Sequence, residues 1–574
     1  MSKLYLPVIA MVGKPLIAQE LVQRFGSGRY YFPILEEPWT TRPDARGEVL
    51  KLNNLLAQIR HEYLIIGGCG ESSIQMLKDI VPDSYWQKSV VVIREAENLR
   101  EALEPLRKYM TRGEGDLHRI QTHEISSLAE GDRIAVIEHS ESLGEVIAEN
   151  YCAFYGYKII KVPPASEHDL DSCEDLLRGW NCAPENSDRY LAQQTLFENL
   201  RSRIGKLEEK ELHRVLFFTR GLPYGVLPFK SPVAHLKQER NLGSQLMRGL
   251  LRVGNKRGIA VALICDPGDL PDTESQTVRQ LLANNGVEIL DLIGANATNH
   301  RFIYTIQYYP YDFAMISSHA GEVNGRRITE EVINTKGEKF EFVYDLFPSF
   351  SGRFIDGKMM VQELTVPVSV NGISWYDKTG LRRDAQGFSL REYFSEERKA
   401  ERKHRKPIRT EACQGVKFSN ALKMNDFNWI PALSTVGDNY YPIIFNNACA
   451  SWMSMGDKFL YAGASAYIGT SKDISTSLAA TCGSRFAQLA IKRRSMLYAL
   501  FVVQKEFVEQ LGYTPYLFWG HPDLSLIPNN SDNKRLRFVR RRANIMAWKK
   551  KSIRAGEDRK RDIQSILECL MESD

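Results

Sequence analysis

Short apolar runs alternate with amphipathic stretches through the N-terminal part of the chain. Four runs have the length and composition of buried strands, and two stretches between them carry apolar residues at helical spacing. This alternation predicts a β-α-β sheet, which we assign to an N-terminal α/β region of residues 1–130. The predicted strands are Tyr5–Val12, Tyr31–Leu35, Tyr63–Gly67 and Val90–Ile93, and the predicted helices are Glu48–Ile59 and Ser73–Ile80.

The same alternation resumes twice along the chain, which at 574 residues is too long for a single hydrophobic core. We expect a second α/β unit at residues 131–255 and a third at residues 256–530. The second contains predicted strands at Ile134–Glu138, Tyr157–Val162 and Val215–Thr219, a helix at Ser142–Tyr155, and helical spacing across Asp169–Leu212. The third contains predicted strands at Ile259–Cys265 and Val287–Leu292 and a helix at Ser275–Asn284.

Two further apolar runs in the third unit stop abruptly at small residues. The run Phe313–Gly321 leaves His319 near its end, and the run Ile443–Ser451 leaves Cys449 in the same place. Each run predicts a strand with a reactive side chain at its carboxyl end. Open α/β sheets hold their active sites at that end of the strands.

An imidazole and a thiol in this arrangement are typical of cysteine proteases. The thiolate attacks the scissile carbonyl, the imidazole takes the thiol proton and returns it to the leaving amine, and backbone N–H groups hold the oxyanion. One such residue alone would mean little, because free cysteines are commonly buried in cores. The prediction depends on the pairing of His319 with Cys449. Small residues beside the pair let a substrate approach the backbone; they are Ala320, Gly321, Ala448 and Ala450.

Together with two later runs, Phe459–Thr470 and Tyr516–Leu526, these strand ends resemble the caspase-like superfamily of cysteine proteases (clan CD). Its CHAT and gingipain-like branches are the most similar, and separases are more distant. The resemblance covers about residues 258–528. It implies an α/β fold with a caspase-like open sheet flanked by helices, and it identifies residues 256–530 as the catalytic domain and 131–255 as a pseudo-caspase unit. We expect no cofactor and no metal ion.

The chain departs from the family pattern in three places. Gly usually follows the catalytic His directly, whereas here Ala320 precedes Gly321, which leaves open whether Ala320, Gly321 or Cys449 supplies the oxyanion N–H groups. His521 stands where the family usually has Asp. The separation between His319 and Cys449 is also long, which predicts an insertion at about residues 326–440.

The insertion begins with strand-like alternation and ends in a charged stretch. Lys339–Tyr344 and Met359–Ile373 predict a hairpin arm, and Ser395–Lys406 predicts a helix. The basic residues of that stretch have two interpretations: a solvated helix face supported by nearby glutamates, or a segment that a protease preferring basic residues cuts in itself.

Composition narrows the class of protein. Hydrophobic content of 43% and charged content of 25% are ordinary for a soluble globular protein, and a net charge of +5 is too small to indicate a dedicated nucleic-acid binder. The nine cysteines are scattered without Cys-x-x-Cys spacing, which favours a reducing compartment over a disulfide or zinc framework. No apolar run approaches the ~20 residues of a membrane helix. We therefore expect a cytoplasmic protein without a membrane span.

The C-terminal residues 531–574 form a basic tail of helical pattern. Its lysines and arginines are interleaved with Phe538 and Trp548, a mixture that suits nucleic-acid backbone or another anionic surface. The alternative is an amphipathic helix docked on the catalytic domain through an apolar face. That face consists of Ile563, Ile566, Leu567 and Leu570.

Asp473 is the candidate determinant of specificity. In separases an acidic residue at the corresponding place faces the bound arginine, so the resemblance implies a preference for a basic P1 residue. A carboxylate in a partly dry pocket pairs bidentately with guanidinium. Two alternatives remain: Asp473 caps a helix that begins near Ser475, or Lys472 neutralises it.

The predicted function is therefore a cysteine endopeptidase that cleaves a protein substrate with a His319–Cys449 dyad. Resemblance to bacterial CHAT-type proteases implies a regulated effector, switched on by a partner or signal, with an anti-phage role. One alternative is a catalytically inactive regulatory or scaffold protein on the same fold. Another is a nucleotide-sensing module that uses the glycine-rich turn Gly67–Ser73.

Overall fold

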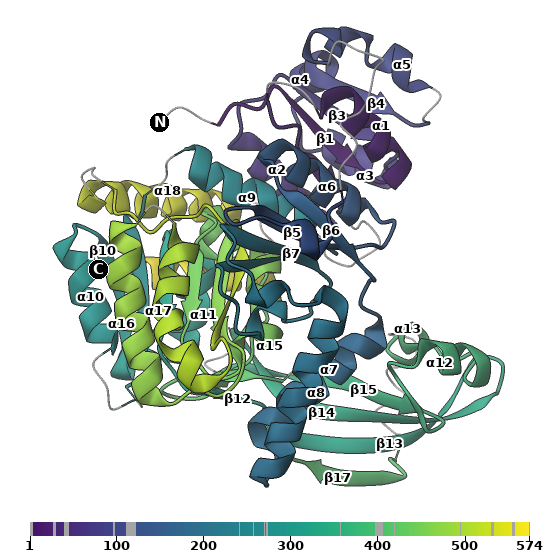
Figure 1. Ribbon diagram of the computed structural model, residues 1–574, viewed down its shortest axis with the longest axis vertical. Helices are drawn as coiled ribbons and strands as arrows, with labels where there is room; N and C mark the ends of the chain where they lie inside the picture. Colours follow the sequence, from purple (N-terminus) through teal and green to yellow (C-terminus); the bar gives the residue numbers. More distant parts are fainter. Residues whose placement is uncertain are drawn as a thin grey trace.

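The computed structural model describes residues 4–26, 30–38, 45–95, 98–110, 122–239, 241–255, 258–268, 270, 274–355, 358–395, 406–417, 419–493, 495–529, 533–553 and 557–572. Within these ranges the strands form sheets of four, ten, three and five strands. The ten-stranded sheet lies at the centre, with the N-terminal sheet above it and a strand-rich arm at the lower right (Figure 1). In that part of the chain no helix has the length and apolar character needed to cross a membrane.

The N-terminal sheet confirms the predicted β-α-β alternation. Its strands are β1 (Val8–Val12), β2 (Ile34–Glu36), β3 (Tyr63–Gly67) and β4 (Val90–Ile93), and its helices are α1 (Pro15–Phe25), α2 (Ala45–Ala57), α3 (Glu71–Lys78), α4 (Asp83–Ser89) and α5 (Leu99–Ala102). The strands are parallel, in the order β2-β1-β3-β4. β1 is central, and all five of its apolar residues are buried, as hydrophobic packing on both faces requires.

A close contact joins this sheet to helix α9 (Leu242–Gly254). The backbone N–H of Gly243 donates to both carboxylate oxygens of Glu36, at 3.1 and 3.0 Å. A Cβ atom at position 243 would lie 2.1 Å from the carbonyl oxygen of Ile34, so only glycine allows the helix to approach β2 this closely.

The central sheet contains ten strands. They are β5 (Arg133–Glu138), β6 (Lys158–Val162), β7 (Arg214–Thr219), β8 (Val233–Lys237), β9 (Val261–Asp266), β10 (Glu288–Ile293), β11 (Phe313–Ile316), β20 (Ile443–Asn446), β21 (Ala466–Thr470) and β22 (Tyr516–Gly520). Their order is β10-β9-β11-β20-β21-β22-β8-β7-β5-β6. β22 runs antiparallel to β21 and parallel to β8, so the two halves of the sheet point in opposite directions.

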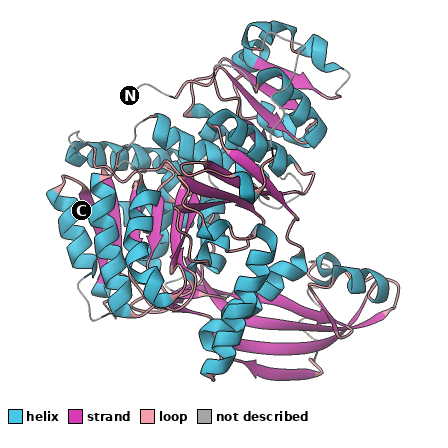
Figure 2. Cartoon of the chain, viewed as in Figure 1, coloured by secondary structure: helices cyan, strands magenta, loops and turns pink. Residues whose placement is uncertain are grey.

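Helices cover both faces of this sheet (Figure 2). One apolar core lies under α6 (Leu143–Tyr155), α9, α10 (Glu274–Asn284), α16 (Thr476–Lys492) and α17 (Met496–Leu511). The other lies under α7 (Glu167–Cys182), α8 (Asn186–Ile204), α11 (Asn299–Tyr308), α15 (Ser451–Ala462) and α19 (Glu557–Glu572). Alternate residues of the buried strands supply the two cores. The chain therefore has the α/β fold class predicted, a large mixed sheet flanked by helices.

The predicted second and third units contribute to one continuous sheet. β5 to β8 come from residues 131–255 and the other six strands from residues 256–530. The two groups meet where Trp519 of β22 pairs with His235 of β8. The domain boundaries and the pseudo-caspase identity of the first group stay predictions.

The insertion forms a larger arm than the hairpin that the sequence predicts. Five antiparallel strands, in the order β16-β15-β14-β13-β17, build a sheet with a small core of its own. They are β13 (Gly325–Ile333), β14 (Lys339–Ile355), β15 (Lys358–Val370), β16 (Ile373–Ser374) and β17 (Arg409–Cys413), with helices α12 (Lys378–Asp384) and α13 (Leu390–Tyr393). Of the predicted charged helix Ser395–Lys406, residues 396–405 lie outside the described residues.

The basic tail folds back onto the central sheet as α18 (Asn533–Ile553) and α19. Arg540 is largely buried and its Nη1 lies 2.7 Å from the buried carboxylate of Asp312. The predicted apolar face of α19 is buried in full. Packing against α11 and the central sheet therefore accounts for this face, whereas nucleic-acid binding by the remaining basic residues stays a prediction.

Candidate active site at the carboxyl edge of β11 and β20

The central sheet brings His319 and Cys449 to the same edge. β11 and β20 are adjacent and parallel, and their last paired residues are Ile316 and Asn446. His319 follows Ile316 by three positions, and Cys449 follows Asn446 by three. Because neighbouring strands lie about 4.8 Å apart, the two segments leave the sheet side by side.

The turn that carries Cys449 has an unusual backbone. Ala450 has φ 46° and ψ 34°, a left-handed conformation that a residue with a Cβ adopts at a cost of about 1 kcal/mol or more. Two contacts hold the conformation: the Ala450 N–H donates to the Lys472 carbonyl at 3.2 Å, and Asn420 Nδ2 donates to the Ala450 carbonyl at 2.7 Å. The turn between β20 and α15 is therefore fixed from two sides.

The Cys449 thiol is half-buried and uncharged in this conformation. Its Sγ lies 3.8 Å from the Ile474 carbonyl oxygen. Burial raises the pKa of the Cys449 thiol, the Asp473 carboxylate raises it further, and the contact with Ile474 offsets part of the increase. At neutral pH the thiol therefore keeps its proton, so a nucleophilic thiolate requires a base or a change in this surrounding.

His319 is exposed, and its segment is fixed through backbone contacts. The His319 carbonyl accepts from the Lys423 N–H at 2.9 Å, and Ser318 Oγ donates to the Lys423 carbonyl at 2.6 Å. Among the residues that the structure describes, no hydrogen bond joins the imidazole to Cys449 Sγ. Catalytic hydrogen bonds are often long in the absence of substrate, so the separation does not remove His319 from the site.

The backbone after His319 forms the edge strand β12 (Ala320–Gly321), which pairs antiparallel with β18 (Ala421–Lys423). Lys423 donates to His319, so by the alternation of antiparallel ladders the next pair, Ala320 with Leu422, is the kind without hydrogen bonds. The Ala320 N–H therefore points away from β18, whereas the Gly321 N–H faces it. A Cβ atom at Gly321 would meet nothing within 4 Å, so this side of the site is open.

Asp473 lies beside Cys449 with an exposed side chain. It does not cap the following helix, because Ser475 Oγ accepts from the N–H of Leu478 at 3.3 Å and supplies the cap of α16. Lys472 forms no ion pair with Asp473 in the described part of the chain, and its ammonium lies 4.7 Å from the ring centre of Trp180. Burial lowers the pKa of Lys472, and the Asp473 carboxylate opposes part of that lowering, so the two charges interact. The capping alternative is therefore wrong, whereas neutralisation by Lys472 stays a prediction.

Helix α7, from the other half of the sheet, contacts both sides of the site. Arg178 forms an ion pair of 2.9 Å with Glu322, just after Gly321, and Asn181 Oδ1 accepts from the Asp473 N–H at 2.9 Å. α7 also lies beside the arm (Figure 1). The sequence predicted a helical region here but gave no signal for these contacts, because residues this far apart in sequence show no local pattern.

A buried polar network lies directly behind the two reactive residues. Glu274, at the start of α10, accepts from Ser317 Oγ at 2.9 Å and from Asn447 Nδ2 at 2.5 Å. The Tyr516 hydroxyl donates to Asn447 Oδ1. A Cβ atom at Gly483 would lie 1.6 Å from a Glu274 oxygen, so glycine makes room for the carboxylate. Sequence reasoning missed this network, although polar residues at the ends of two buried strands were a usable signal.

His521 belongs to the opposite edge of the sheet. β22 is antiparallel to β21, and its first residue, Tyr516, pairs with the last residue of β21, Thr470. His521 therefore follows the far end of β22. It is buried, its Nε2 lies 2.9 Å from the Tyr151 hydroxyl, and burial lowers its pKa to about 4. It is a neutral core residue.

The glycine-rich turn after β3 also has a structural role. The Gly70 N–H and the Ser73 hydroxyl both donate to the Glu37 carboxylate, at 2.8 and 2.5 Å. The chain's own carboxylate thus takes the place at the start of α3 that a phosphate would need. The nucleotide-sensing alternative therefore has no free anion site at this turn.

Comparison with known proteins gives one partial similarity in structure. No protein-family model matches the chain, and no curated protein matches its sequence. Among solved structures, the crystal structure of the Arg-specific cysteine proteinase gingipain R is similar with a TM-score of 0.33 and 9% sequence identity. The match covers 70% of this chain and 80% of the gingipain chain. A similarity of this size says nothing about the chemistry of the chain.

Proposed function

We propose that this protein is a cysteine endopeptidase in which His319 and Cys449 form the catalytic dyad. The observation that carries the proposal is the register of β11 and β20, in which both residues stand three positions beyond a paired residue at one edge of the sheet. The strained turn at Ala450 is a second support, because backbone strain persists only where surrounding contacts maintain it and is concentrated at functional sites.

The reaction follows from these positions. His319 takes the proton from Cys449, and the thiolate forms a bond to the scissile carbonyl carbon while the carbonyl electron pair moves to oxygen. The outward-facing N–H of Ala320 and the N–H of Cys449 donate to that oxyanion. Collapse of the intermediate breaks the C–N bond, and the imidazolium returns the proton to the leaving amine. Water, deprotonated by His319, then hydrolyses the thioester and releases Cys449.

Asp473 gives this site a preference for a basic P1 residue. Its carboxylate is exposed, forms no ion pair with a lysine or arginine of the described residues, and lies close enough to Cys449 to raise the thiol pKa. A substrate guanidinium that pairs with Asp473 would offset this negative charge, so the correct substrate would also favour the thiolate. The same contact thus contributes to both specificity and activation.

The uncharged thiol in the substrate-free conformation supports a regulated enzyme. We place it, by resemblance, among bacterial effectors that a partner or signal switches on, with an anti-phage role. A phage challenge of cells expressing wild type or Cys449→Ala checks this context. Equal survival of the two would contradict it.

The second candidate is an inactive scaffold on the same fold. It is favoured by the raised thiol pKa and by the lack of a direct His319–Cys449 hydrogen bond in the described part of the chain. The two candidates differ in one respect that can be measured, since a scaffold tolerates the loss of either side chain.

Fluorogenic peptides with Arg, Lys, Leu or Asp at P1 test the proposal. Wild type should cleave the Arg and Lys peptides, whereas Cys449→Ala and His319→Ala should lose nearly all activity. Cys413→Ala is the matched control, because Cys413 is also a half-buried free thiol but lies on the arm. Cleavage by Cys449→Ala at the wild-type rate would reject the dyad.

A further inference from the structure

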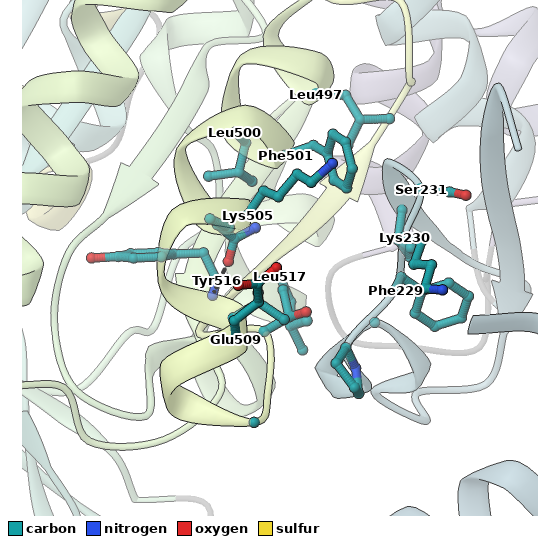
Figure 3. A pocket seen from close by; sticks show the side chains of 17 residues that line it. Phe229, Lys230, Ser231, Leu497, Leu500, Phe501, Lys505, Glu509, Tyr516 and Leu517 are labelled. Carbon is teal, nitrogen blue, oxygen red and sulfur yellow. Dashed lines mark hydrogen bonds between the residues drawn. The ribbon is translucent and has the colours of Figure 1, made fainter. Parts of the chain in front are cut away.

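A second site lies at the seam between the two halves of the central sheet. A cavity of about 350 Å³ opens between α17 and the loop that precedes β8 (Figure 3). Its walls are mainly apolar, formed by side chains such as Phe229, Leu500, Phe501 and Leu517. The volume is at the lower end of the range for small-molecule pockets, about 300–1,000 Å³, which suits one small ligand.

The cavity lies at the same edge of the sheet as the candidate active site. Tyr516 and Leu517, the first residues of β22, line it, and Tyr516 pairs with Thr470 at the carboxyl end of β21. β21 is in turn the neighbour of β20, which leads to Cys449.

One side chain connects the cavity with that site. Tyr516 lines the cavity, and its hydroxyl donates to Asn447 Oδ1, two residues before Cys449. Gln504 of α17 also lines the cavity, and its Oε1 accepts from the Tyr516 N–H at 2.6 Å. A ligand that moves α17 or β22 therefore changes contacts that position the Cys449 turn.

The charged groups of the cavity indicate what it binds. Lys505 of α17 and Lys230 of the facing loop lie on opposite walls (Figure 3). Both are exposed, and neither forms an ion pair with a carboxylate in the described ranges. Glu509, one helical turn after Lys505, is the acidic residue of the lining. Two unpaired ammonium groups over an apolar interior fit a ligand with one apolar chain and one anionic head.

We propose that this cavity binds a medium-chain fatty carboxylate and that its occupancy controls the reactivity of Cys449. The chain lies among the apolar side chains, and the carboxylate lies between the two lysines. The binding step stands on the cavity alone, whereas the control of Cys449 rests on the proposed function.

Calorimetric titration of the full-length protein with decanoate tests the binding step, with decanol as the uncharged analogue. Decanoate should bind saturably and at least about tenfold more tightly than decanol, a difference of about 1.4 kcal/mol. The double variant Lys230→Gln, Lys505→Gln should lose about tenfold in affinity. Lys492→Gln, which alters an exposed lysine of the neighbouring helix, should bind as wild type does.

A variant that fills the cavity completes this test. Leu500→Trp should abolish binding, with its thermal unfolding measured to establish that it is folded. Undetectable binding of decanoate to wild type, equal affinity for decanol, or unchanged binding in both Leu500→Trp and the double lysine variant would each overturn the site.

The control of Cys449 is tested separately by its rate of alkylation with iodoacetamide. Saturating decanoate should change that rate by about threefold or more. Tyr516→Phe, which removes only the hydroxyl, should keep the binding and lose the change in rate. If decanoate binds but the alkylation rate does not change, the proposed effect on Cys449 is refuted and the proposed binding site stands. Because neither readout needs peptide cleavage, failure of the proposed protease activity would be distinguished from failure of the binding site.

Discussion

The two halves of the central sheet differ in the polar groups that stand at their strand ends. In the half formed by β5 to β8, the buried Glu138 ends β5 and accepts hydrogen bonds from Thr219, at 2.8 Å, and from the backbone of Arg220 and Ala165. These groups satisfy one another. In the other half, the ends of β11 and β20 lead to His319 and Cys449, and the buried Glu274 satisfies the residues behind them.

The comparison shows that the two halves differ in the residues beyond their strand ends rather than in their fold. Each half contains adjacent parallel strands, a buried glutamate and helices on each face. Among the described residues, the half that contains β11 and β20 carries an imidazole and a thiol together, His319 and Cys449, just beyond adjacent strand ends. The other half has exposed imidazoles at its strand ends, such as His139, and contributes to the site through α7, which contacts Glu322 and Asp473.

The largest expected effect comes from replacing an exposed histidine in each half. His319→Ala should lower kcat/KM by about a thousandfold, because it removes the general acid and base. His213→Ala is the matched change at the start of β7, at the same edge of the sheet, and should leave kcat/KM unchanged. If both variants lost kcat/KM for the Arg peptide to a similar extent, the two halves would not differ in their contribution to catalysis.

Asp473→Asn should separate reactivity from specificity. The loss of the carboxylate should lower kcat/KM for the Arg peptide by about tenfold or more and have little effect on the Leu peptide. The thiol pKa should fall at the same time, because the charge that raises it is gone. Iodoacetamide should therefore alkylate Cys449 faster at a given pH, by about threefold. An unchanged P1 preference would remove Asp473 from the substrate pocket.

The two buried glutamates offer a paired test of the comparison. Glu274→Gln loses one acceptor site in the network behind the dyad and should lower kcat by about tenfold with little change in KM. Glu138→Gln makes the same chemical change in the other half. It should lower the midpoint of thermal unfolding and leave kcat unchanged. If kcat responds equally to both, the Glu274 network has no special link to the dyad.

The expected effect that is most remote from catalysis is a pH dependence of stability at the contact between α7 and the segments that flank the arm. Burial raises the pKa of Glu174 to about 7, with Glu322 adding to the increase and Lys417 and Arg178 opposing it. The folded state thus holds this proton more tightly than the unfolded chain. The resulting stability is fully present below the unfolded pKa, about 4.3, and is lost as pH rises through about 7.

Urea unfolding of wild type and Glu174→Gln at pH 5 and pH 8 measures this contribution. The variant should show a smaller loss of unfolding free energy between the two pH values, by about 2 kcal/mol. Equal losses in wild type and variant would show that Glu174 does not titrate in this range.

The sequence predicted those parts of the fold that depend on local pattern. The apolar run Tyr63–Gly67 matches β3, because a buried parallel strand needs continuous apolar residues. The run Val90–Ile93 matches the edge strand β4, which is partly buried. β8 was missed, since its five residues include a histidine and a lysine. The arm was underestimated because the charged residues of β13 come in adjacent pairs, Arg326-Arg327 and Glu330-Glu331, which break the alternation expected of a half-buried strand.

The candidate site was predictable only in part for a related reason. His319 and Cys449 could be predicted because each lies within a nine-residue run whose apolar residues give way to small ones. The contacts of Glu274 and Arg178 join residues that are far apart in the sequence, and no local pattern encodes them. The position of Asp473 beside the thiol likewise depends on how β20 and β21 pair.

The most direct test of the central claim is to map where a covalent protease inhibitor reacts. An acyloxymethyl ketone with arginine at P1 is incubated with the full-length protein, and the modified peptide is identified by mass spectrometry. The account predicts one adduct, on Cys449, whose formation slows in His319→Ala and in Asp473→Asn but not in His213→Ala. An adduct on one of the other eight cysteines would contradict the account. The absence of any inhibitor adduct, in a protein whose Cys449 iodoacetamide still alkylates, would also contradict it.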